Sequence, residues 1–334
     1  MSLLSGKKVL VTGGTGSFGR YVVNRLLAED VAEIRIFSRD EKKQFDMRHR
    51  FSDPRVRFFL GDVRDRTAVE EAMGGVEVVF HAAALKQVPH CEKFPTEAIG
   101  TNVLGARNVV QAAIEEAVEA VIAISTDKAV QPVNVMGMTK ALQERLLANA
   151  QNSTRNRGTR FLAVRYGNVL NSRGSVVPFF RNLLRRGKRL TITNPDMTRF
   201  LLTLNQAVDL VLYAYREGRG GELFVRKAPS ARIVDLAKAV CELAGAPCEY
   251  DIIGIYPGEK IHEILISEEE RTRCEEQDEY FLIHPWRQDP KIDYEVEEYN
   301  SRDHVVSVEE IKRMIEEADR AASQIDFEEG YFSR

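Results

Sequence analysis

A short polar stretch near the middle of the chain gathers the side chains best suited to acid–base chemistry. Within the sixteen residues that begin at Ser125, it holds the hydroxyl of Thr126, the carboxylate of Asp127 and the amines of Lys128 and Lys140. An apolar run that predicts a buried strand precedes it, and a pattern that predicts a helix follows it. Because burying titratable groups costs free energy, their collection at a strand end indicates a reactive site. The alternative for the adjacent aspartate and lysine is an ordinary ion pair on the surface.

Six strands that alternate with helices are expected to position this stretch. Apolar runs predict them at residues 7–13, 33–37, 56–60, 76–80, 121–124 and 161–165. This alternation predicts a parallel sheet with helices on both faces, an α/β fold of the doubly wound Rossmann type, over residues 1–168. Beyond it we expect a smaller C-terminal α+β substrate lobe at residues 169–334, with elements near 200–228 returning to the first domain. Ligands of such sheets bind at the carboxyl ends of the strands, where the polar stretch lies.

A glycine-rich turn joins the first predicted strand to a helix, which is the context of a dinucleotide site. Gly13 permits the tight turn, Gly16 lets the backbone approach a pyrophosphate, and Gly19 lets the helix and the strand pack closely. The helix N-terminus offers free N–H donors to the phosphates. A simple tight turn is the alternative. The other positions of this turn that we assign to the cofactor are Thr15, Ser17 and Phe18.

The end of the second predicted strand bears on the choice of cofactor. A site for NAD places a carboxylate there, to hold the ribose 2′-hydroxyl. Here Ser38 and Arg39 come first and suit a 2′-phosphate, with Lys43 close behind. Asp40 is the group that would suit NAD. We predict NADP rather than NAD, the alternative being that Arg39 is an ordinary surface cation.

Further groups follow the other strands at the same edge of the sheet. Asp62 is placed to accept a hydrogen bond from the adenine amine, and small alanines after His81 leave room for a cofactor. His81 itself is either a catalytic base or a residue that packs and hydrogen-bonds locally. The remaining positions that we assign to the cofactor site are Val63, Ala82, Ala83, Ala84, Asn102 and Tyr166. In the second half of the chain, the segment 258–260 is expected to open a helix.

The composition excludes several classes of function. The 334 residues carry a net charge of −3, which gives no general attraction to nucleic acids or anionic membranes. The four cysteines show neither metal-ligand spacing nor a redox pair, so we expect no metal. The sequence lacks the roughly 20 consecutive apolar residues that span a bilayer, and its first residues lack a signal-peptide pattern. We therefore expect a cytoplasmic protein.

Several motifs together resemble one enzyme family. They are Thr12–Gly19, Ser38–Glu41, Gly61–Asp65, His81–Lys86, Ser125–Lys128, Arg165–Val169, Ser172–Val176, Met197–Phe200 and Gly258–Lys260. Over nearly its whole length, the chain resembles the extended short-chain dehydrogenases/reductases that act on nucleotide sugars. More narrowly, it resembles the inverting UDP-N-acetylglucosamine 4,6-dehydratases. The triplet Thr-Asp-Lys is the most specific motif, because related dehydratases that retain configuration have glutamate at its third position.

The resemblance implies a reaction on UDP-N-acetylglucosamine. Tightly bound NADP takes hydride from position 4 of the sugar and returns it to position 6, after loss of the proton at position 5 and of the 6-hydroxyl as water. Lys128 is the candidate base at position 5, for which its pKa would have to fall toward neutrality. Asp127 is the acid for the 6-hydroxyl, Thr126 binds the 4-oxygen, and Lys140 binds the nicotinamide ribose.

The resemblance also implies substrate contacts and a homo-oligomer, with a hexamer as one candidate state. Arginine suits a diphosphate because its planar guanidinium binds two phosphate oxygens at once. The positions that we assign to the substrate are Lys86, Asn168, Arg173, Ser175, Val176, Arg199 and Glu259.

Met136 departs from the usual pattern of short-chain dehydrogenases. They place a tyrosine four residues before the helical lysine, as the base of the oxidation step, whereas this chain has methionine. A thioether has no proton to exchange. A capsule-type branch that the chain resembles also has methionine there, so we keep Met136 among the catalytic positions. We expect Lys128 or Lys140 to take the 4-hydroxyl proton; alternatively, Met136 packs against the nicotinamide or the sugar.

Two other functions compete with the dehydratase. A UDP-sugar 4-epimerase would use the same cofactor without eliminating water. A non-catalytic NADP-binding protein that has lost its tyrosine is the second alternative, and the intact Thr126–Lys128 triplet argues against it.

Overall fold

A nine-stranded sheet forms the centre of the computed structural model, which describes residues 3–285 and 296–325. Its strands lie in the order β14 (Cys274–Glu276), β15 (Tyr280–Ile283), β10 (Leu223–Arg226), β6 (Arg160–Arg165), β5 (Ala120–Ile124), β4 (Val78–His81), β1 (Lys8–Thr12), β2 (Glu33–Ser38) and β3 (Val56–Leu60). The strands from β3 to β10 are parallel, and β15 and β14 add an antiparallel edge.

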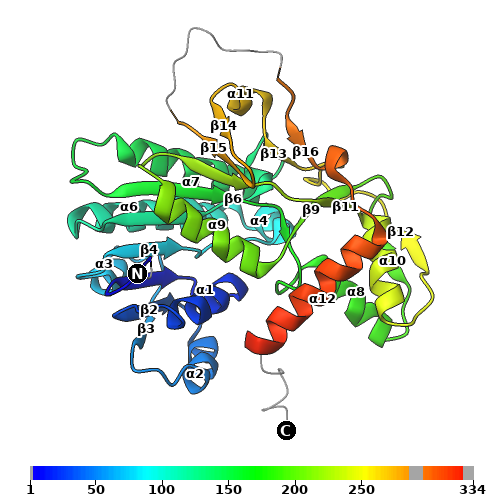
Figure 1. Cartoon of the computed structure of the whole chain (residues 1–334), viewed down its shortest axis with the longest axis horizontal. Coiled ribbons are helices and arrows are strands. Elements are labelled where there is room, and N and C mark those ends of the chain that lie inside the picture. Colours follow the sequence, from blue (N-terminus) through cyan, green and yellow to red (C-terminus); the bar gives the residue numbers. More distant parts are fainter. Residues whose placement is uncertain (1–2, 286–295, 326–334) are drawn as a thin grey trace.

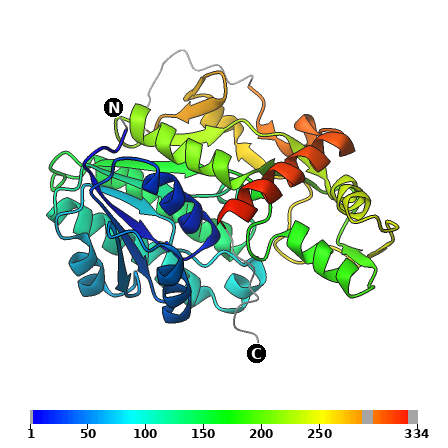
Figure 2. The ribbon, with the colours of Figure 1, turned by 60° about the horizontal axis from the view of Figure 1, so that its bottom comes forward.

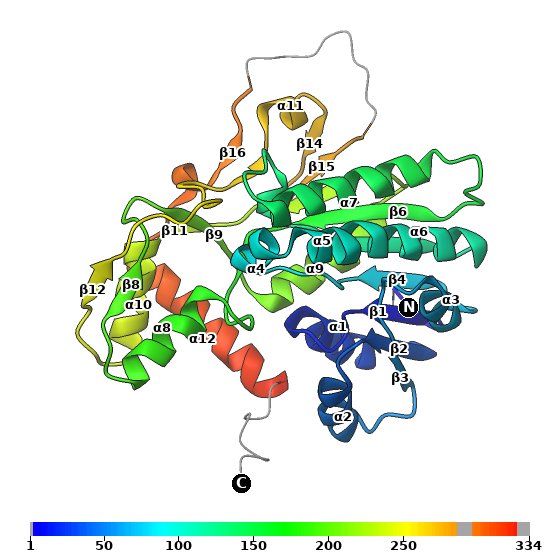
Figure 3. The ribbon, with the colours of Figure 1, turned by 180° about the vertical axis from the view of Figure 1, so that it is seen from behind.

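Helices cover both faces of this sheet. One face carries α3 (Arg66–Met73), α6 (Gly105–Glu115) and α7 (Val135–Gln151), and the other carries α1 (Ser17–Leu27) and α9 (Leu204–Glu217), as Figures 1 and 3 show from opposite sides. Alternate residues of β1 divide between the two faces: Val9 and Val11 join the core under α1 and α9, and Leu10 joins the core under α3, α6 and α7. The predicted Rossmann-type α/β fold is confirmed.

The helical stretch that ends with α6 is not one continuous α-helix. It consists of α5 (Pro95–Ala98), a π-helical segment (Ile99–Leu104) and α6, and it follows the short helix α4 (Val88–Lys93). On the opposite face, beside α1, helix α2 (Glu41–Arg50) follows β2 and contributes Met47 to the core there. A π turn widens the helix by one residue and often marks a functional position.

A second group of elements packs beside the sheet (Figure 2). It contains the three-stranded sheet of β7 (Asn168–Val169), β9 (Thr198–Leu202) and β11 (Ser230–Arg232), and the pair of β8 (Leu190–Ile192) and β12 (Tyr250–Ile252). Its helices are α8 (Val176–Arg185), α10 (Ile233–Leu243) and α12 (Val308–Ile325). Apolar side chains from these helices, such as Phe180, Leu236 and Ile311, form a separate core.

Some elements from the second half of the chain belong to the large sheet. β10 is one of its strands, and α9 packs on its face. β14 and β15 are also strands of it, although they lie in the range that we assigned to the substrate lobe. The segment after Gly258 does not open a helix, contrary to expectation. It leads into β13 (Ile264–Ile266), which pairs with β16 (Tyr299–Asn300), and the short helix α11 (Glu268–Arg271) follows.

Arg165 joins the large sheet to α11 and the segment before it through a buried charge network. Its guanidinium donates to Glu144 on α7 at 2.7 Å, to Glu270 on α11 at 2.8 Å and to the carbonyl of Leu265 at 2.8 Å. Such a network is costly to break because each member would be left charged without a partner. It therefore fixes the segment 263–270 against the end of β6. In the described part of the chain, each helix is too short or too polar to cross a bilayer.

Candidate active site

Thr126, Asp127 and Lys128 form a tight turn at the carboxyl end of β5. The amide of Asp127 donates to the carbonyl of Tyr166 at 3.1 Å, which ties the turn to the neighbouring strand β6. The hydroxyl of Thr126 accepts from the amide of Lys128 at 3.4 Å, and the residues Asp127–Ala129 complete a single 3-10 turn. The edge of the sheet thus presents three consecutive polar side chains.

Helix α7 presses directly on this turn. Asn134 caps the helix by accepting from the amide of Gly137 at 2.8 Å. A Cβ atom at Gly137 would lie 2.0 Å from the carbonyl oxygen of Lys128, which is closer than any real contact. Glycine is therefore required for the close approach of the helix to the turn.

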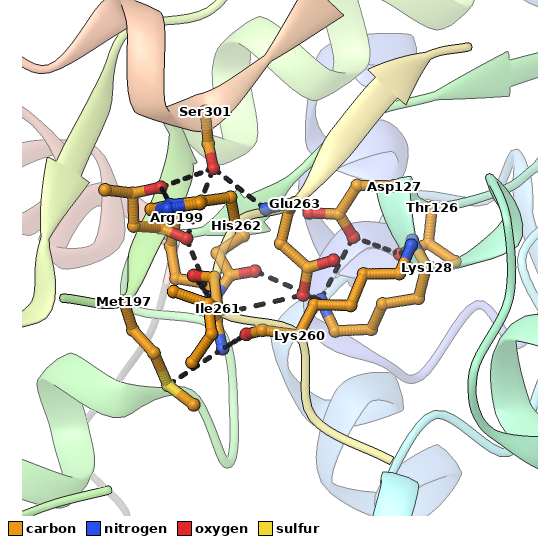
Figure 4. Close-up of polar contacts among 12 residues, drawn as sticks. Thr126, Asp127, Lys128, Met197, Arg199, Lys260, Ile261, His262, Glu263 and Ser301 are labelled. Atoms are coloured by element: carbon orange, nitrogen blue, oxygen red, sulfur yellow. Dashed lines mark hydrogen bonds and ion pairs between the residues drawn. The ribbon is translucent and has the colours of Figure 1, made fainter. Parts of the chain in front are cut away.

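Lys128 lies between two buried carboxylates (Figure 4). Its Nζ is 3.0 Å from Oδ1 of Asp127, 3.1 Å from Oε1 of Glu263 and 3.4 Å from Oδ1 of Asn168. Asp127 is fully buried and Glu263 is 2% exposed. Among the described residues, neither Oδ2 of Asp127 nor Oε2 of Glu263 has a hydrogen-bond partner. Sequence reasoning missed Glu263, because it lies directly before β13, far along the chain and outside any motif that we had assigned to the site.

The three charges of this cluster shift one another's pKa in different directions. Burial raises the pKa of the Asp127 carboxyl, and it outweighs the opposing charge of Lys128; the charge of Glu263 adds to the rise. Burial alone would lower the pKa of Lys128, but the charges of Asp127 and Glu263 raise it above its usual value. The expected lowering of the Lys128 pKa is therefore wrong for this conformation. A raised Asp127 pKa is what an acid that protonates a leaving hydroxyl requires.

Lys140 has the opposite environment. It is 6% exposed, and its Nζ donates to Oε1 of Gln143 at 2.6 Å. Burial lowers the pKa of Lys140 to about 8, and the charge of Glu144 opposes this shift. Of the two lysines, Lys140 is the one that loses its proton more readily and can then act as a base.

Met136 and His81 both have local packing roles. The Met136 side chain is buried in a small apolar cluster with Cys91 and Ala98, under α4 and α5. The Nδ1 atom of His81 lies 2.8 Å from the hydroxyl of Thr12. Burial lowers the pKa of His81 to about 3, so the ring is neutral and the local alternative for this residue applies.

The glycine turn has the expected geometry. Gly13 has a φ of 66°, and a Cβ atom there would lie 2.8 Å from the amide nitrogen of Ala83. A Cβ atom at Gly19 would lie 2.3 Å from the carbonyl oxygen of Gly14, so helix α1 packs closely on the turn. Gly16 caps α1 without a side-chain hydrogen bond, which leaves the first amides of the helix available to a phosphate.

The polar groups after β2 are arranged around Asp40. Its carboxylate caps α2 by accepting from the amide of Lys43 at 3.0 Å, and it also pairs with the Lys43 ammonium. Arg39 is half-exposed and lies 3.3 Å from Oδ2 of Asp62, which Arg64 also contacts at 2.7 Å. The carboxylate that would favour NAD is thus engaged by its own helix.

The remaining residues that we assigned to the cofactor site lie on several elements. Near the turn, the hydroxyls of Thr15 and Ser38 are 2.8 Å apart. Asn102 is fully buried and bonds to the backbone of Leu85 and to Thr139, so its side chain fixes the segment after β4. The other assigned residues are Ser17 and Phe18 on α1, buried Val63 after β3, half-buried Ala82, Ala83 and Ala84 after β4, and buried Tyr166 after β6.

The assigned substrate residues do not converge on one point. The amide of Arg173 donates to the hydroxyl of Ser17 at 3.1 Å, which places the loop before α8 against the glycine turn. The guanidinium of Arg199 donates to the carbonyls of Thr198 and Lys260, so it holds the segment beside Glu263. The others are exposed Lys86 after β4, Asn168 beside Lys128, Ser175 and Val176 at the start of α8, and Glu259, which accepts from the amide of Tyr256.

Comparison with known proteins identifies relatives over most of the chain. Residues 9–285 match the model of a family described as "Polysaccharide biosynthesis protein". Curated relatives from Rickettsia canadensis and Rickettsia felis, both named "UDP-glucose 4-epimerase", are 52% and 53% identical over 282 residues. These matches cover 83% of this chain and 82% of each relative.

Solved structures agree with this match. Pen from Bacillus thuringiensis superimposes with a TM-score of 0.89 and 36% identity, and the match covers 95% of this chain and 99% of Pen. DesIV from Streptomyces venezuelae, described as a dTDP-glucose 4,6-dehydratase with NAD and TYD bound, superimposes with a TM-score of 0.72. Its match covers 96% of this chain and 99% of DesIV, and at 18% identity it is evidence of the fold alone.

Proposed function

The chain belongs to the polysaccharide biosynthesis protein family and has the fold of an extended short-chain dehydrogenase/reductase. From its site residues, we propose that it is a nucleotide-sugar 4,6-dehydratase. The proposed substrate is UDP-N-acetylglucosamine, and the product is a UDP-4-keto-6-deoxy-hexosamine with inverted configuration at position 5. Such a product serves the synthesis of surface polysaccharides or glycans.

The observation that carries this proposal is the buried pair of Asp127 and Lys128 at the end of β5. Elimination of water needs an acid at the 6-oxygen and a base at position 5, and two adjacent side chains of these types supply both. A 4-epimerase needs neither group, since it only removes and returns one hydride at position 4. The full burial of Asp127 and its raised pKa also exclude the surface ion pair considered from the sequence.

The glycine turn supports a nicotinamide dinucleotide cofactor, because it combines close backbone approach at Gly13 with open amides at the start of α1. NADP held there would supply the acceptor for the hydride of position 4 and the donor of that hydride to position 6. Half-exposed Arg39 and the engaged carboxylate of Asp40 support NADP over NAD.

The acid–base steps use Lys140 for the oxidation and Asp127 with Lys128 for the elimination. Lys140, whose pKa is lowered to about 8, takes the 4-hydroxyl proton in place of the missing tyrosine. Thr126 hydrogen-bonds the 4-oxygen, and Asp127 protonates the 6-hydroxyl as it leaves as water. Lys128 takes the proton from position 5, for which it must first lose a proton of its own.

UDP-sugar 4-epimerase activity is the second candidate, and the names of the rickettsial relatives favour it over dehydration. An epimerase would also use the cofactor turn and Lys140. It would leave the Asp127–Lys128 pair without a chemical role, which is why the dehydratase remains our first proposal.

The distinguishing experiment is incubation of the purified protein with UDP-N-acetylglucosamine and, separately, with UDP-glucose, followed by mass spectrometry. We expect a product of UDP-N-acetylglucosamine that is lighter by one water. With deuterium at position 4 of the substrate, the label should appear at position 6. A product of unchanged mass that carries its label at position 4 would establish the epimerase instead.

A further inference from the structure

Glu263 occupies a position in the site that none of the acid–base steps uses. It lies on the segment that precedes β13, and Figure 4 shows its carboxylate and that of Asp127 both close to the end of the Lys128 side chain. Its Oε1 is 3.1 Å from Nζ of Lys128 and 3.8 Å from Nε of Arg199. Its backbone amide donates to the hydroxyl of Ser301 at 2.9 Å, which fixes the residue in place.

The Lys128 ammonium alone does not balance two buried carboxylates, so the carboxylate with fewer other cations around it is the one that favours a proton. The two carboxylates compete for this proton, and their other neighbours decide the outcome. Glu263 has Arg199 and Lys260 nearby in addition to Lys128, whereas Asp127 has mainly Lys128 and the hydroxyl of Thr126.

We propose that Glu263 is the ionised carboxylate of this cluster and acts as a positioning residue, which keeps Asp127 protonated and holds the Lys128 ammonium beside it. The 3.1 Å contact between Oε1 and Nζ carries this role, and no covalent bond forms or breaks. This inference rests on the proposed dehydration for its kinetic consequence, but the charge assignment itself does not.

The pKa directions agree with this geometry. Burial alone would raise the pKa of Glu263, but the charges of Lys128 and Arg199, followed by that of Lys260, lower it below its usual value. The pKa of Asp127 moves the other way. The polar and charged groups around Asp127 are Thr126 and Lys128 on its own turn, Asn168 on β7, Arg199 on β9, and Lys260 and Glu263 before β13.

The first test measures the protonation of Asp127 directly, without substrate. Infrared difference spectra between the wild type and Asp127→Asn give the carboxylic-acid band of Asp127 as a function of pH. In a Glu263→Gln background, we expect the midpoint of this band to move down by about one pH unit or more, because a negative neighbour is removed. In Lys260→Met, it should move up, because a positive neighbour is removed.

The kinetic test uses the same variants. Glu263→Gln should slow elimination about 100-fold at neutral pH. It should leave the formation of reduced cofactor intact, and activity should recover as the pH is lowered. Glu263→Asp should restore much of the rate. Glu269→Gln is the control: it removes an exposed carboxylate from the same part of the chain that contacts Arg273 rather than Lys128, so it should shift neither the band nor the pH profile.

The outcomes separate this inference from the proposed function. An unshifted Asp127 band in both Glu263→Gln and Lys260→Met would overturn the charge assignment, and if one variant does not fold, the other decides. Shifted bands in a protein that does not dehydrate its substrate would retain the assignment and overturn the dehydratase. An unchanged pH profile in an active Glu263→Gln enzyme would overturn the role of Glu263 in keeping Asp127 protonated during elimination.

Discussion

Lys128 and Lys140 lie twelve residues apart and share the carboxyl edge of one sheet, yet their surroundings are opposite. Lys128 is held between the carboxylates of Asp127 and Glu263, and its pKa is raised. Lys140 is bonded to an amide, and burial lowers its pKa to about 8. The same residue type thus holds its proton firmly in one place and releases it more readily in the other. Burial alone does not set the charge of a lysine; the neighbouring carboxylates decide it.

The largest expected effect comes from Asp127, the carboxylate beside Lys128. Asp127→Asn keeps the shape of the side chain and removes the acid, so dehydration should fall about 1,000-fold. The oxidation step should persist, because it depends on Lys140, and the absorbance of reduced cofactor should rise after substrate is added. Rapid mixing with UDP-N-acetylglucosamine measures both. Normal turnover in this variant would remove the reason for preferring a dehydratase.

The role of Lys140 is tested by Lys140→Met, which retains the apolar bulk of the side chain without its amine. The oxidation step should slow about 100-fold, with little reduced cofactor formed. Thermal unfolding serves as the control for folding. A variant that oxidises its substrate at the wild-type rate would show that another group takes the 4-hydroxyl proton.

The pH dependence sharpens the same point. Below a pKa of about 8, Lys140 is charged and cannot accept a proton, so kcat/KM should rise with pH and level off above this value. Below pH 8, the slope should approach a tenfold change for each pH unit. This rise should be absent from the residual activity of Lys140→Met. A flat profile from pH 6 to 9 in the wild type would contradict the role of Lys140.

The contact between helix α7 and the turn at Lys128 should have a smaller effect, which falls on stability. Gly137→Ala places a methyl group against the carbonyl of Lys128 and should lower the free energy of unfolding by about 1–3 kcal/mol. Gly100→Ala is the matched control, since its added methyl group meets only the Arg64 side chain at 3.5 Å. Urea denaturation of both variants provides the measurement. Equal stability of the two would mean that α7 can move away from the turn at no cost.

The smallest effect is expected at Arg39, which follows β2 and lies away from both lysines. Arg39→Ala should weaken NADP binding about tenfold, by loss of one charge-assisted contact, and leave NAD binding nearly unchanged. Calorimetric titration of cofactor-free protein with each dinucleotide tests this. A loss of the same size for NAD would show that Arg39 does not recognise the 2′-phosphate.

The sequence predicted the first six strands to within two residues, because each is an apolar run bounded by polar or small residues. It did not predict that β14 and β15 extend the large sheet. These strands are short and half-exposed, and their pairing depends on partners that are distant in the chain. The segment after Gly258 was wrongly predicted as a helix for a similar reason: β13 is a strand because β16 is beside it.

The local chemistry of the site was therefore determined by the sequence alone. The glycine turn, the triplet at the end of β5 and the lysine one helical turn beyond Met136 lie next to their own strands, so short-range patterns suffice to place them. Only the tertiary structure decided the charges. Glu263 reaches Lys128 from the segment before β13, far along the chain, where Ser301 and the network around Arg165 hold it. Electrostatic interactions depend on distance through space and on burial, and neither can be measured along the chain.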